Sequence, residues 1–360
     1  MIIYILGAFI LSMVCGAFFT PMILDYCKRK KIYDIPNERK VHTKAIPRLG
    51  GISFFPSMVL GFAVCLVIIA SNGGIDHPFS IWSAGFLVGL GLMYVVGIVD
   101  DLFGLNATTK FIAQICSACL LPMAGLYINN LYGLFGITEI PALVGIPLTI
   151  FIIVFICNAI NLIDGIDGLA AALSFLALGG FLIYFMHYQV FRHTYSILAA
   201  GLMGAIVVFL YFNIFGKPER NTKIFMGDSG SLSLGYTLGF LAIKTTMDVP
   251  YIWPYRPEAL LVATTLLFIP TADVVRVTLY RLFHKKPLFR ADKNHIHHKL
   301  MRTGLNQHQA LLCIIALTIL ICVFNFLTYS TLSITVILLA DIAIYCCVNG
   351  VINLKMKQGE

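Results

Sequence analysis

Acidic side chains are scarce in this sequence, and several of them fall in short polar motifs. The 360 residues include only 17 Asp and Glu. Two of these, Asp100 and Asp101, are adjacent in the motif V-D-D-L-F-G-L. Adjacent carboxylates repel each other, and a bound cation or a shared proton relieves the repulsion. We interpret them as a candidate metal-binding or general-base pair, with a solvated helix end as the alternative.

A second motif brings four oxygen-bearing side chains into ten residues. The segment 158–167 reads N-A-I-N-L-I-D-G-I-D. Residues three apart share one face of a helix, so all four side chains point the same way if the segment is helical. The four are Asn158, Asn161, Asp164 and Asp167. Helix capping does not explain this set between two apolar runs, and we expect a ligand-binding segment.

A third motif, F-M-G-D-S-G-S, begins at Phe225 and contains Asp228. Its G-D-S-G is shared with chymotrypsin-like proteases, but that fold is all-β and this segment opens an apolar run. A turn of small residues at the start of a helix offers free N–H groups to a phosphate. Because Mg²⁺ takes one or two carboxylates together with phosphates and water, Asp228 is a candidate ligand of a hard cation.

Histidines gather in a fourth motif. The segment 292–298 reads D-K-N-H-I-H-H and contains His295, His297 and His298, with Arg290 shortly before it. Zinc sites usually space their ligands more widely and often add Cys, and no Cys is near. We expect this cationic segment to recognise a diphosphate or a sugar. A zinc site and a solvated loop are the alternatives.

A fifth motif is cationic and lies near the N-terminus. Residues 34–51 contain D-I-P-N-E-R-K-V-H, then Lys44, then P-R-L-G-G. Clustered cations between Pro and Gly turns favour a shaped anion site. The alternative is loop charge that only sets membrane topology.

Long apolar runs separate these motifs. Hydrophobic residues make up 59% of the chain and charged residues 12%, whereas a soluble domain carries about 25% charged residues. A membrane-spanning helix needs about 20 mostly apolar residues. The sequence predicts eleven such helices, at 3–24, 50–70, 81–99, 109–127, 142–160, 168–186, 195–213, 230–246, 258–280, 309–327 and 331–353. The predicted fold is an all-α polytopic membrane protein with one domain over residues 1–360.

The basic residues predict the orientation of this protein in the membrane. Lys and Arg are concentrated in 25–49, 217–223, 281–308 and 355–357. With eleven helices these segments share one side, which the positive-inside rule makes cytoplasmic. We therefore expect an outside N-terminus, a cytoplasmic C-terminus and the polar motifs at the cytoplasmic face. The net charge of +8 does not indicate nucleic acid as a partner, because the cations lie beside spanning segments.

The remaining segments carry no recognisable chemistry. Segment 127–141, on the opposite side, is rich in Tyr, Asn and Gly and predicts a small hairpin. The ten Cys are scattered and show no disulfide framework. No Lys or Arg precedes the first apolar run, so we expect a retained helix there and not a cleaved signal peptide.

Together and in this order, the motifs resemble those of one family. D-I-P-N-E-R-K-V-H…P-R-L-G-G, D-D-x-x-x-L…K-F, N-A-I-N-L-I-D-G-I-D-G-L, F-M-G-D-S-G-S and H-I-H-H are similar to the motifs of the polyprenyl-phosphate N-acetylhexosamine-1-phosphate transferases. The phospho-N-acetylmuramoyl-pentapeptide branch has three consecutive histidines in place of H-I-H-H. The chain is therefore more similar to the branch that transfers GlcNAc-1-phosphate to undecaprenyl phosphate.

The resemblance implies a role for each motif. Asp228 and Asn161 would bind Mg²⁺, which Mn²⁺ could replace. The implied catalytic residues are Asp100, Asp101, Asp228 and His297, of which Asp100 or Asp101 would act on the lipid phosphate as base or orienter. The implied substrate-binding residues are Asp164, Asp167, Phe225, Lys44, Asn213, Arg290, His295 and His298. Among these, Phe225 would stack on uracil.

The implied reaction joins two anions at the inner face of the cytoplasmic membrane. A polyprenyl phosphate oxygen attacks the β-phosphorus of a UDP-N-acetylhexosamine and expels UMP, so catalysis consists largely of positioning and charge neutralisation. The product would start a lipid-linked cell-surface polysaccharide such as O-antigen. The expected partners are the UDP-sugar, undecaprenyl phosphate and membrane lipids, and a homodimer stays open.

Two alternative functions stay open at this point. One is a phospho-N-acetylmuramoyl-pentapeptide transferase-like enzyme that uses another UDP-sugar. The other is an ion-coupled transporter, which predicts ionisable residues near the middle of the bilayer. The polar motifs of this sequence fall instead at one predicted face.

Overall fold

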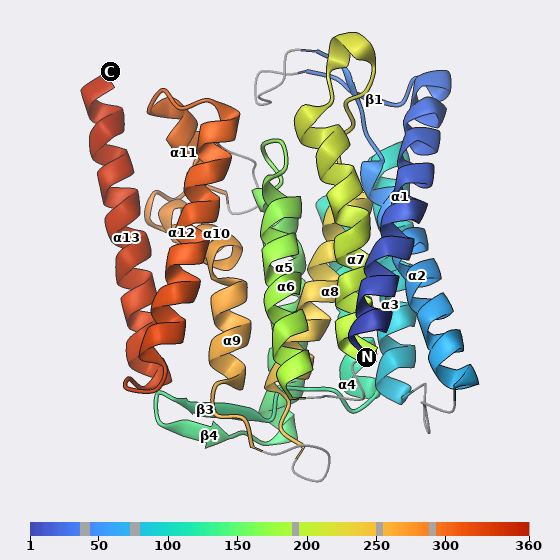
Figure 1. Cartoon of the computed structure of the whole chain (residues 1–360). Helices are drawn as coiled ribbons and strands as arrows, with labels where there is room; N and C mark the ends of the chain where they lie inside the picture. Colours follow the sequence, from blue (N-terminus) through green and yellow to red (C-terminus); the bar gives the residue numbers. More distant parts are fainter. Residues whose placement is uncertain (37–43, 73–79, 189–193, 250–254, 288–292, 360) are drawn as a thin grey trace.

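A computed structural model describes residues 1–36, 44–72, 80–188, 194–249, 255–287 and 293–359. Within these ranges the chain is a bundle of α-helices (Figure 1). The helices are α1 Ile2–Lys30, α2 Phe54–Ser71, α3 Ile81–Phe103, α4 Ala107–Met123, α5 Ala142–Ile163, α6 Leu169–His187, α7 Thr194–Leu210, α8 Asp228–Thr246, α9 Ala259–Leu266, α10 Phe268–Phe283, α11 Ile296–Arg302, α12 Gln307–Thr328 and α13 Ile334–Gly359. Shorter helical turns are η1 Gly50–Ser53, η3 Tyr211–Phe215 and η4 Pro218–Arg220.

The bundle confirms an all-α, multi-pass membrane protein. Within the described ranges, 8 helices are long and apolar enough to cross a membrane. The pair α9 and α10, bent by 67° at Leu267, would make a ninth span. A helix or this bent pair overlaps each of the eleven predicted ranges. The count of eleven and the orientation stay predictions, because α4 has only 17 residues and α8 is not among the candidate spans.

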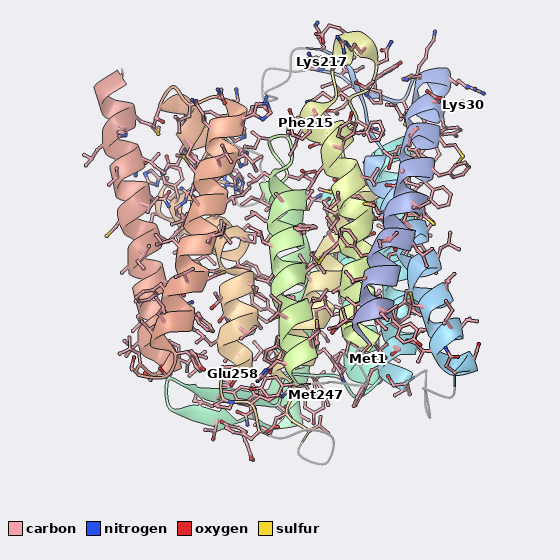
Figure 2. The ribbon with its side chains drawn as sticks, viewed as in Figure 1. Met1, Lys30, Phe215, Lys217, Met247 and Glu258 are labelled. Carbon is pink, nitrogen blue, oxygen red and sulfur yellow. The ribbon has the colours of Figure 1, made fainter. Side chains whose placement is uncertain are left out.

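The two ends of the bundle differ in charge and in the elements they carry. The chain begins at one end and finishes at the other (Figure 1). Figure 2 shows Lys30 and Lys217 at the end where the chain finishes, and Met1, Met247 and Glu258 at the opposite end. This separation is what the distribution of basic residues predicts, and we call the end with Lys30 and Lys217 the cationic end.

Two small antiparallel hairpins cover the ends. At the cationic end, β1 Tyr33–Asp34 pairs with β2 Ile46–Pro47. At the opposite end, β3 Asn130–Leu134 pairs with β4 Ile137–Glu139, which confirms the hairpin predicted in 127–141.

Helix α8 lies at the centre of the bundle, where it packs against α3 and α5. All of its residues after Asp228 are buried. Small residues permit this close packing. A Cβ atom on Gly97 of α3 would lie 2.4 Å from the Cα atom of Ser229, and one on Gly235 would lie 2.6 Å from the Cα atom of Cys157 in α5. The packing fixes the first turn of α8 at the cationic end.

Candidate active site

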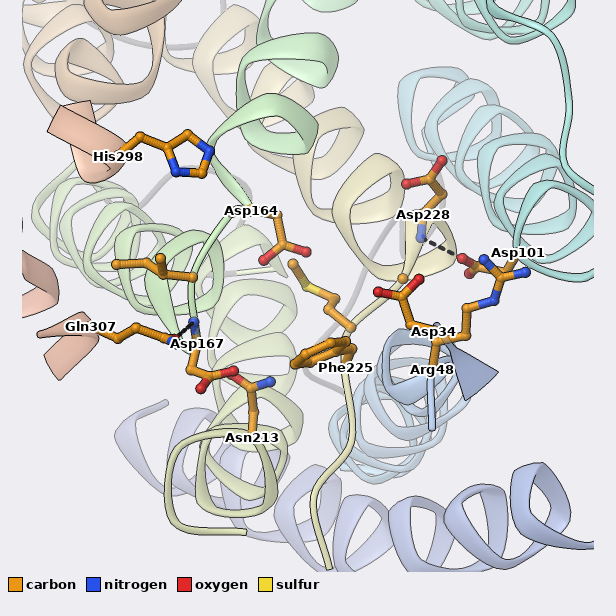
Figure 3. A pocket seen from close by; sticks show the side chains of 14 residues that line it. Asp34, Arg48, Asp101, Asp164, Asp167, Asn213, Phe225, Asp228, His298 and Gln307 are labelled. Atoms are coloured by element: carbon orange, nitrogen blue, oxygen red, sulfur yellow. Dashed lines mark hydrogen bonds between the residues drawn. The ribbon is translucent and has the colours of Figure 1, made fainter. Parts of the chain in front are cut away.

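A pocket of about 300 Å³ opens at the cationic end, beside the first turn of α8. Its volume is at the lower limit for small-molecule sites. All five sequence motifs contribute lining residues, and Asn213 and Gln307 join them from other segments (Figure 3). The lining residues are Asp34, Arg48, Asp101, Asp164, Gly165, Ile166, Asp167, Asn213, Phe225, Met226, Gly227, Asp228, His298 and Gln307.

The carboxylate of Asp101 holds the start of α8. Its two oxygen atoms accept hydrogen bonds from the backbone N–H groups of Asp228 and Ser229, each 2.9 Å long. The first N–H groups of a helix have no partner within the helix, so Asp101 satisfies two of them. Gly227 makes this approach feasible, because its φ is 77° and a Cβ atom there would lie 2.5 Å from Asp101 Oδ2. The bonds fix where the Asp228 side chain points.

Lys110 joins the two carboxylates that flank this turn. Its Nζ lies 2.9 Å from Asp100 Oδ2 and 3.0 Å from Asp228 Oδ2. Asp100 also accepts a hydrogen bond from the backbone N–H of Leu105. The adjacent residues Asp100 and Asp101 therefore bond to different elements, and of the two only Asp101 lines the pocket.

The interpretation of the sequence did not include Lys110 among the site residues. A signal was present, because Lys110 lies inside the predicted apolar run 109–127. An ionisable residue within such a run indicates a functional position.

Asn161 and Asp228, to which the resemblance assigns Mg²⁺, lie in contact. The Asn161 amide donates to Asp228 Oδ1 and to Ser231 Oγ, both at 2.8 Å. Asn158, one turn earlier in α5, instead exchanges hydrogen bonds with Gln114 of α4. The two side chains therefore do not share the face that the sequence predicted, because Asn161 faces the first turn of α8 and Asn158 connects α4 to α5.

Asp164 and Asp167 lie on the turn between α5 and α6 and form one wall of the pocket. The Asp164 carboxyl is exposed to the water of the pocket, although the protein around the pocket partly desolvates it. This desolvation, followed by the charges of Asp228, Asp167 and Asp101, raises the pKa of Asp164 to about 8. Asp167 pairs with Lys223 at 2.7 Å, a second cation that the sequence interpretation did not assign to the site.

Two predicted binding residues owe their positions to the backbone around them. Asn213 Oδ1 accepts a hydrogen bond of 2.6 Å from the N–H of Gly168, and its amide donates to the Ile224 carbonyl at 2.8 Å. Phe225 donates its N–H to the Pro47 carbonyl at 2.8 Å. The Phe225 ring lies at the pocket, between the Asp164 turn and Arg48 (Figure 3). An aromatic ring that lines a pocket can stack on a planar ring of a ligand.

The three histidines occupy different environments. His298 lines the pocket, and burial followed by nearby positive charges lowers its pKa to about 4, so its ring is neutral at pH 7. His297 is only 1% exposed and packs behind the pocket wall, where a Cβ atom on Gly165 would lie 2.1 Å from its Nε2. Burial lowers the pKa of His297 to about 3. His295 is buried away from the pocket lining, with its Nδ1 2.7 Å from Asp273 Oδ2.

Two predicted cationic contacts are not among the pocket residues. Lys44 is exposed and forms an ion pair with Glu219 of η4. Arg290 lies outside the described residues.

The pocket is a suitable place for a hard divalent cation. Five carboxylates, those of Asp34, Asp101, Asp164, Asp167 and Asp228, line it, and carboxylate and amide oxygen atoms are the protein ligands that Mg²⁺ prefers. No group of three or more His, Cys, Asp or Glu within the described ranges is arranged as a closed metal cage. Mg²⁺ fits such an incomplete set, because it keeps water and substrate phosphates among its ligands.

Comparisons with known proteins agree with the class of site that this geometry defines. Residues 83–246 match the family described as glycosyl transferase family 4. The chain is 31% identical, over 99% of its length and 95% of the relative's, to a probable undecaprenyl-phosphate N-acetylglucosaminyl 1-phosphate transferase of Bacillus subtilis (strain 168). It is also 31% identical to the undecaprenyl-phosphate alpha-N-acetylglucosaminyl 1-phosphate transferase of Yersinia pestis, over 79% of this chain and 73% of that protein.

A similar enzyme of Escherichia coli (strain K12) is 29% identical over 82% of this chain and 77% of its own length. The chain belongs to glycosyl transferase family 4, and it is a sugar-phosphate transferase within that family.

Proposed function

We propose that this enzyme transfers N-acetylglucosamine-1-phosphate from UDP-N-acetylglucosamine to undecaprenyl phosphate and releases UMP. The names of the relatives support this donor class and acceptor. The observation that carries the proposal is the pocket at the cationic end, where five carboxylates and the Phe225 ring line one space. Such a site suits a metal-bound nucleotide diphosphate, because the cation neutralises both the carboxylates and the phosphates.

The proposed reaction forms one P–O bond and breaks another. A phosphate oxygen of the lipid attacks the β-phosphorus of the UDP-sugar. The bond from that phosphorus to the bridging oxygen breaks, and UMP leaves with its electron pair. The lipid phosphate is already ionised at pH 7, so general-base catalysis contributes little. We therefore assign Asp100 and Asp101 to orientation of the site. The hydrogen bonds of Asp101 to the first turn of α8 support that role.

Asp228 and Asn161 are the proposed metal ligands, with Mg²⁺ as the physiological ion and Mn²⁺ as a substitute. The bound ion would polarise the diphosphate of the donor. Lys110 keeps Asp228 beside Asn161 and compensates the charge of Asp100. The mutual contacts of these four side chains support a preorganised site, which lowers the reorganisation needed during reaction.

The nucleotide and the sugar are proposed to occupy the rest of the pocket. Phe225 would stack on uracil, with Asp164 and Asp167 beside the uridine. His298 is neutral at pH 7 and can donate a hydrogen bond to the sugar or the diphosphate. Lys44 and Arg290 are proposed to bind the diphosphate. For Lys44 this would require release from Glu219.

The cationic end is proposed to face the cytoplasm of a bacterial inner membrane. The nucleotide donor comes from the cytosol and the acceptor stays in the bilayer, so the site has to lie at their common boundary. The many Lys and Arg at this end support the orientation. The product would be the first lipid-linked intermediate of a cell-surface polysaccharide.

A donor panel tests the proposal. The purified enzyme with undecaprenyl phosphate and Mg²⁺ should release UMP from UDP-N-acetylglucosamine faster than from other UDP-N-acetylhexosamines or UDP-N-acetylmuramoyl-pentapeptide. Preference for the muramoyl-pentapeptide donor would assign the chain to the other branch. Absence of UMP release with every donor would reject the proposed function.

A further inference from the structure

A fully buried carboxylate, Asp273 of α10, lies outside the pocket and has no role in the reaction described above. Its side chain is 0% exposed. Four groups donate hydrogen bonds to it. These are His295 Nδ1 at 2.7 Å, the Ile296 N–H at 3.0 Å, Arg276 Nη2 at 2.7 Å and the Tyr345 hydroxyl at 3.0 Å. A buried charge is tolerated only when it is paired and hydrogen-bonded, and Asp273 satisfies both conditions.

The donors to Asp273 connect three elements of the C-terminal part of the bundle. Arg276 lies one turn further along α10, and Tyr345 belongs to α13. The other two donors are the residues that begin α11, the helix that carries His297 and His298. His295 is the N-cap residue of α11 but makes no capping hydrogen bond with its side chain. Asp273 supplies that missing acceptor from a different helix, because it binds the Ile296 N–H.

The same carboxylate determines which nitrogen of His295 carries hydrogen. An ionised carboxylate only accepts hydrogen bonds, so Nδ1 of His295 must be protonated. The His295 ring stacks on the His297 ring with 5.9 Å between centroids, and the His297 and His298 centroids are 4.2 Å apart. A row of rings thus leads from Asp273 to His298 at the pocket.

The row of rings also contacts the pocket wall that Asp164 and Asp167 form. His297 packs against Gly165, between the pocket carboxylates Asp164 and Asp167. The far side of α11 is tied to α13, because Lys299 donates to Asn349 Oδ1 at 3.4 Å. A shift of His295 would therefore move the pocket wall and His298 together.

We propose that Asp273 is a positioning residue, which acts through His295 to hold the histidine segment of α11 against the substrate pocket. The role of His298 in binding the donor rests on the proposed function. The link between Asp273 and His295 does not depend on it. Outer partners of metal-binding histidines fix tautomer and orientation, and their loss typically costs about 10- to 100-fold in metal affinity or activity. We expect a loss of similar size for the Asp273 contact with His295.

The first test is spectroscopic and needs no substrate. Protein labelled with ¹⁵N-histidine shows the protonation of each ring nitrogen, and the His295 signals are assigned by their loss in His295→Ala. In the native protein Nδ1 of His295 should carry hydrogen. In Asp273→Asn the amide N–H₂ faces the ring, so Nδ1 should become an acceptor and the hydrogen should move to Nε2. The same tautomer in both proteins would overturn the proposal.

The second test is a double-mutant cycle on UMP release. Asp273→Asn and His295→Ala should each lower kcat about 10- to 100-fold, and the double variant should be no slower than the slower single variant. Multiplied losses would show that Asp273 acts independently of His295 and would overturn the proposal. If native enzyme releases no UMP, the proposed function fails, and the ¹⁵N experiment still decides the link.

Matched variants distinguish a positioning role of Asp273 from a general loss of folding or stability. Asp341 of α13 is another fully buried aspartate, bonded to Asn325 of α12 at 2.8 Å, and neither residue is among those that line the pocket. Asp341→Asn should keep kcat within about threefold of native, which is well below the loss expected at Asp273. If Asp273→Asn is not recovered as folded protein, Tyr345→Phe with His295→Ala forms a second cycle around the intact carboxylate. Non-additive losses in that cycle support the proposal, and additive losses overturn it.

Discussion

Lys110 is the residue whose loss should reveal most about the assembly of the site. Its ammonium group lies about 3 Å from two carboxylates, those of Asp100 and Asp228. One such pair contributes at most about 5.5 kcal/mol at an effective dielectric constant of about 20. Water reaches 27% of the Lys110 side chain. The interaction free energy of the pair therefore lies between that of exposed ion pairs, about 0–1 kcal/mol, and the cost of breaking a buried pair, about 3–5 kcal/mol.

Lys110→Met should therefore raise the activation free energy by about 3 kcal/mol, or lower kcat/KM about 100-fold. The two carboxylates repel each other once the cation is gone, and Asp228 moves away from Asn161. Lys110→Arg keeps the charge but not the compact ammonium, and we expect a loss of about 10-fold, which corresponds to about 1.4 kcal/mol.

The assay is UMP release from UDP-N-acetylglucosamine in detergent micelles that contain undecaprenyl phosphate. Lys28→Met is the matched control, because Lys28 pairs with Asp25 on an exposed part of α1. That change should leave kcat/KM within about twofold of native, as expected for an exposed pair. More than half of the native activity in Lys110→Met would refute the assignment of Lys110 to the site.

Three further predictions concern the pocket and the metal. The pKa of Asp164 is raised to about 8 in the folded protein. Its contribution to folding stability is therefore full below the unfolded-state pKa of about 4 and disappears as the pH rises towards 8. In EDTA, the melting temperature of Asp164→Asn relative to that of native protein should rise between these pH values, and a constant difference contradicts the raised pKa. Gly165→Ala places a Cβ atom 2.1 Å from His297 Nε2 and should lower both the melting temperature and turnover. The control Gly91→Ala, with open space around it, should change neither. Equal behaviour of the two variants would rule out close packing of His297 against the pocket wall at Gly165. EDTA should abolish UMP release and Mg²⁺ or Mn²⁺ should restore it, and full activity after exhaustive chelation would exclude the proposed metal role.

Hydropathy predicted where the helices lie, because lipid requires long apolar segments with internally bonded backbones. Each predicted range overlaps a helix or the bent pair, and the hairpin at β3 and β4 was also anticipated. The bend of 67° between α9 and α10 was not. It depends on how the two segments pack against the bundle, which the composition of a single apolar run does not reveal.

The composition of the site was largely predictable, but its internal bonding was not. Motifs around Asp164, Phe225, Asp228 and His298 converge on one pocket. Lys110 lies in the K-F motif but was given no role in the site, because its partner Asp228 is 118 residues away. Nothing in a sequence separates the roles of two adjacent aspartates, because their hydrogen bonds come from different parts of the fold.

Asp273 illustrates the same difficulty within an apolar run. The residue lies in the range 258–280, where hydropathy predicts only a membrane span. Its connection to His295 exists because α10, α11 and α13 meet around one carboxylate. The trace of this contact in the sequence is the pair of ionisable residues Asp273 and Arg276 within that run.

The central claim is that the sugar moves together with its phosphate. UDP-N-acetylglucosamine labelled with ³²P at the β-phosphate distinguishes this reaction from transfer of the sugar alone. With undecaprenyl phosphate and Mg²⁺, native enzyme should place the label in the lipid product and release unlabelled UMP, and Asp228→Asn should do neither at a comparable rate. Recovery of the label in free UDP, with an unlabelled lipid product, would contradict the account.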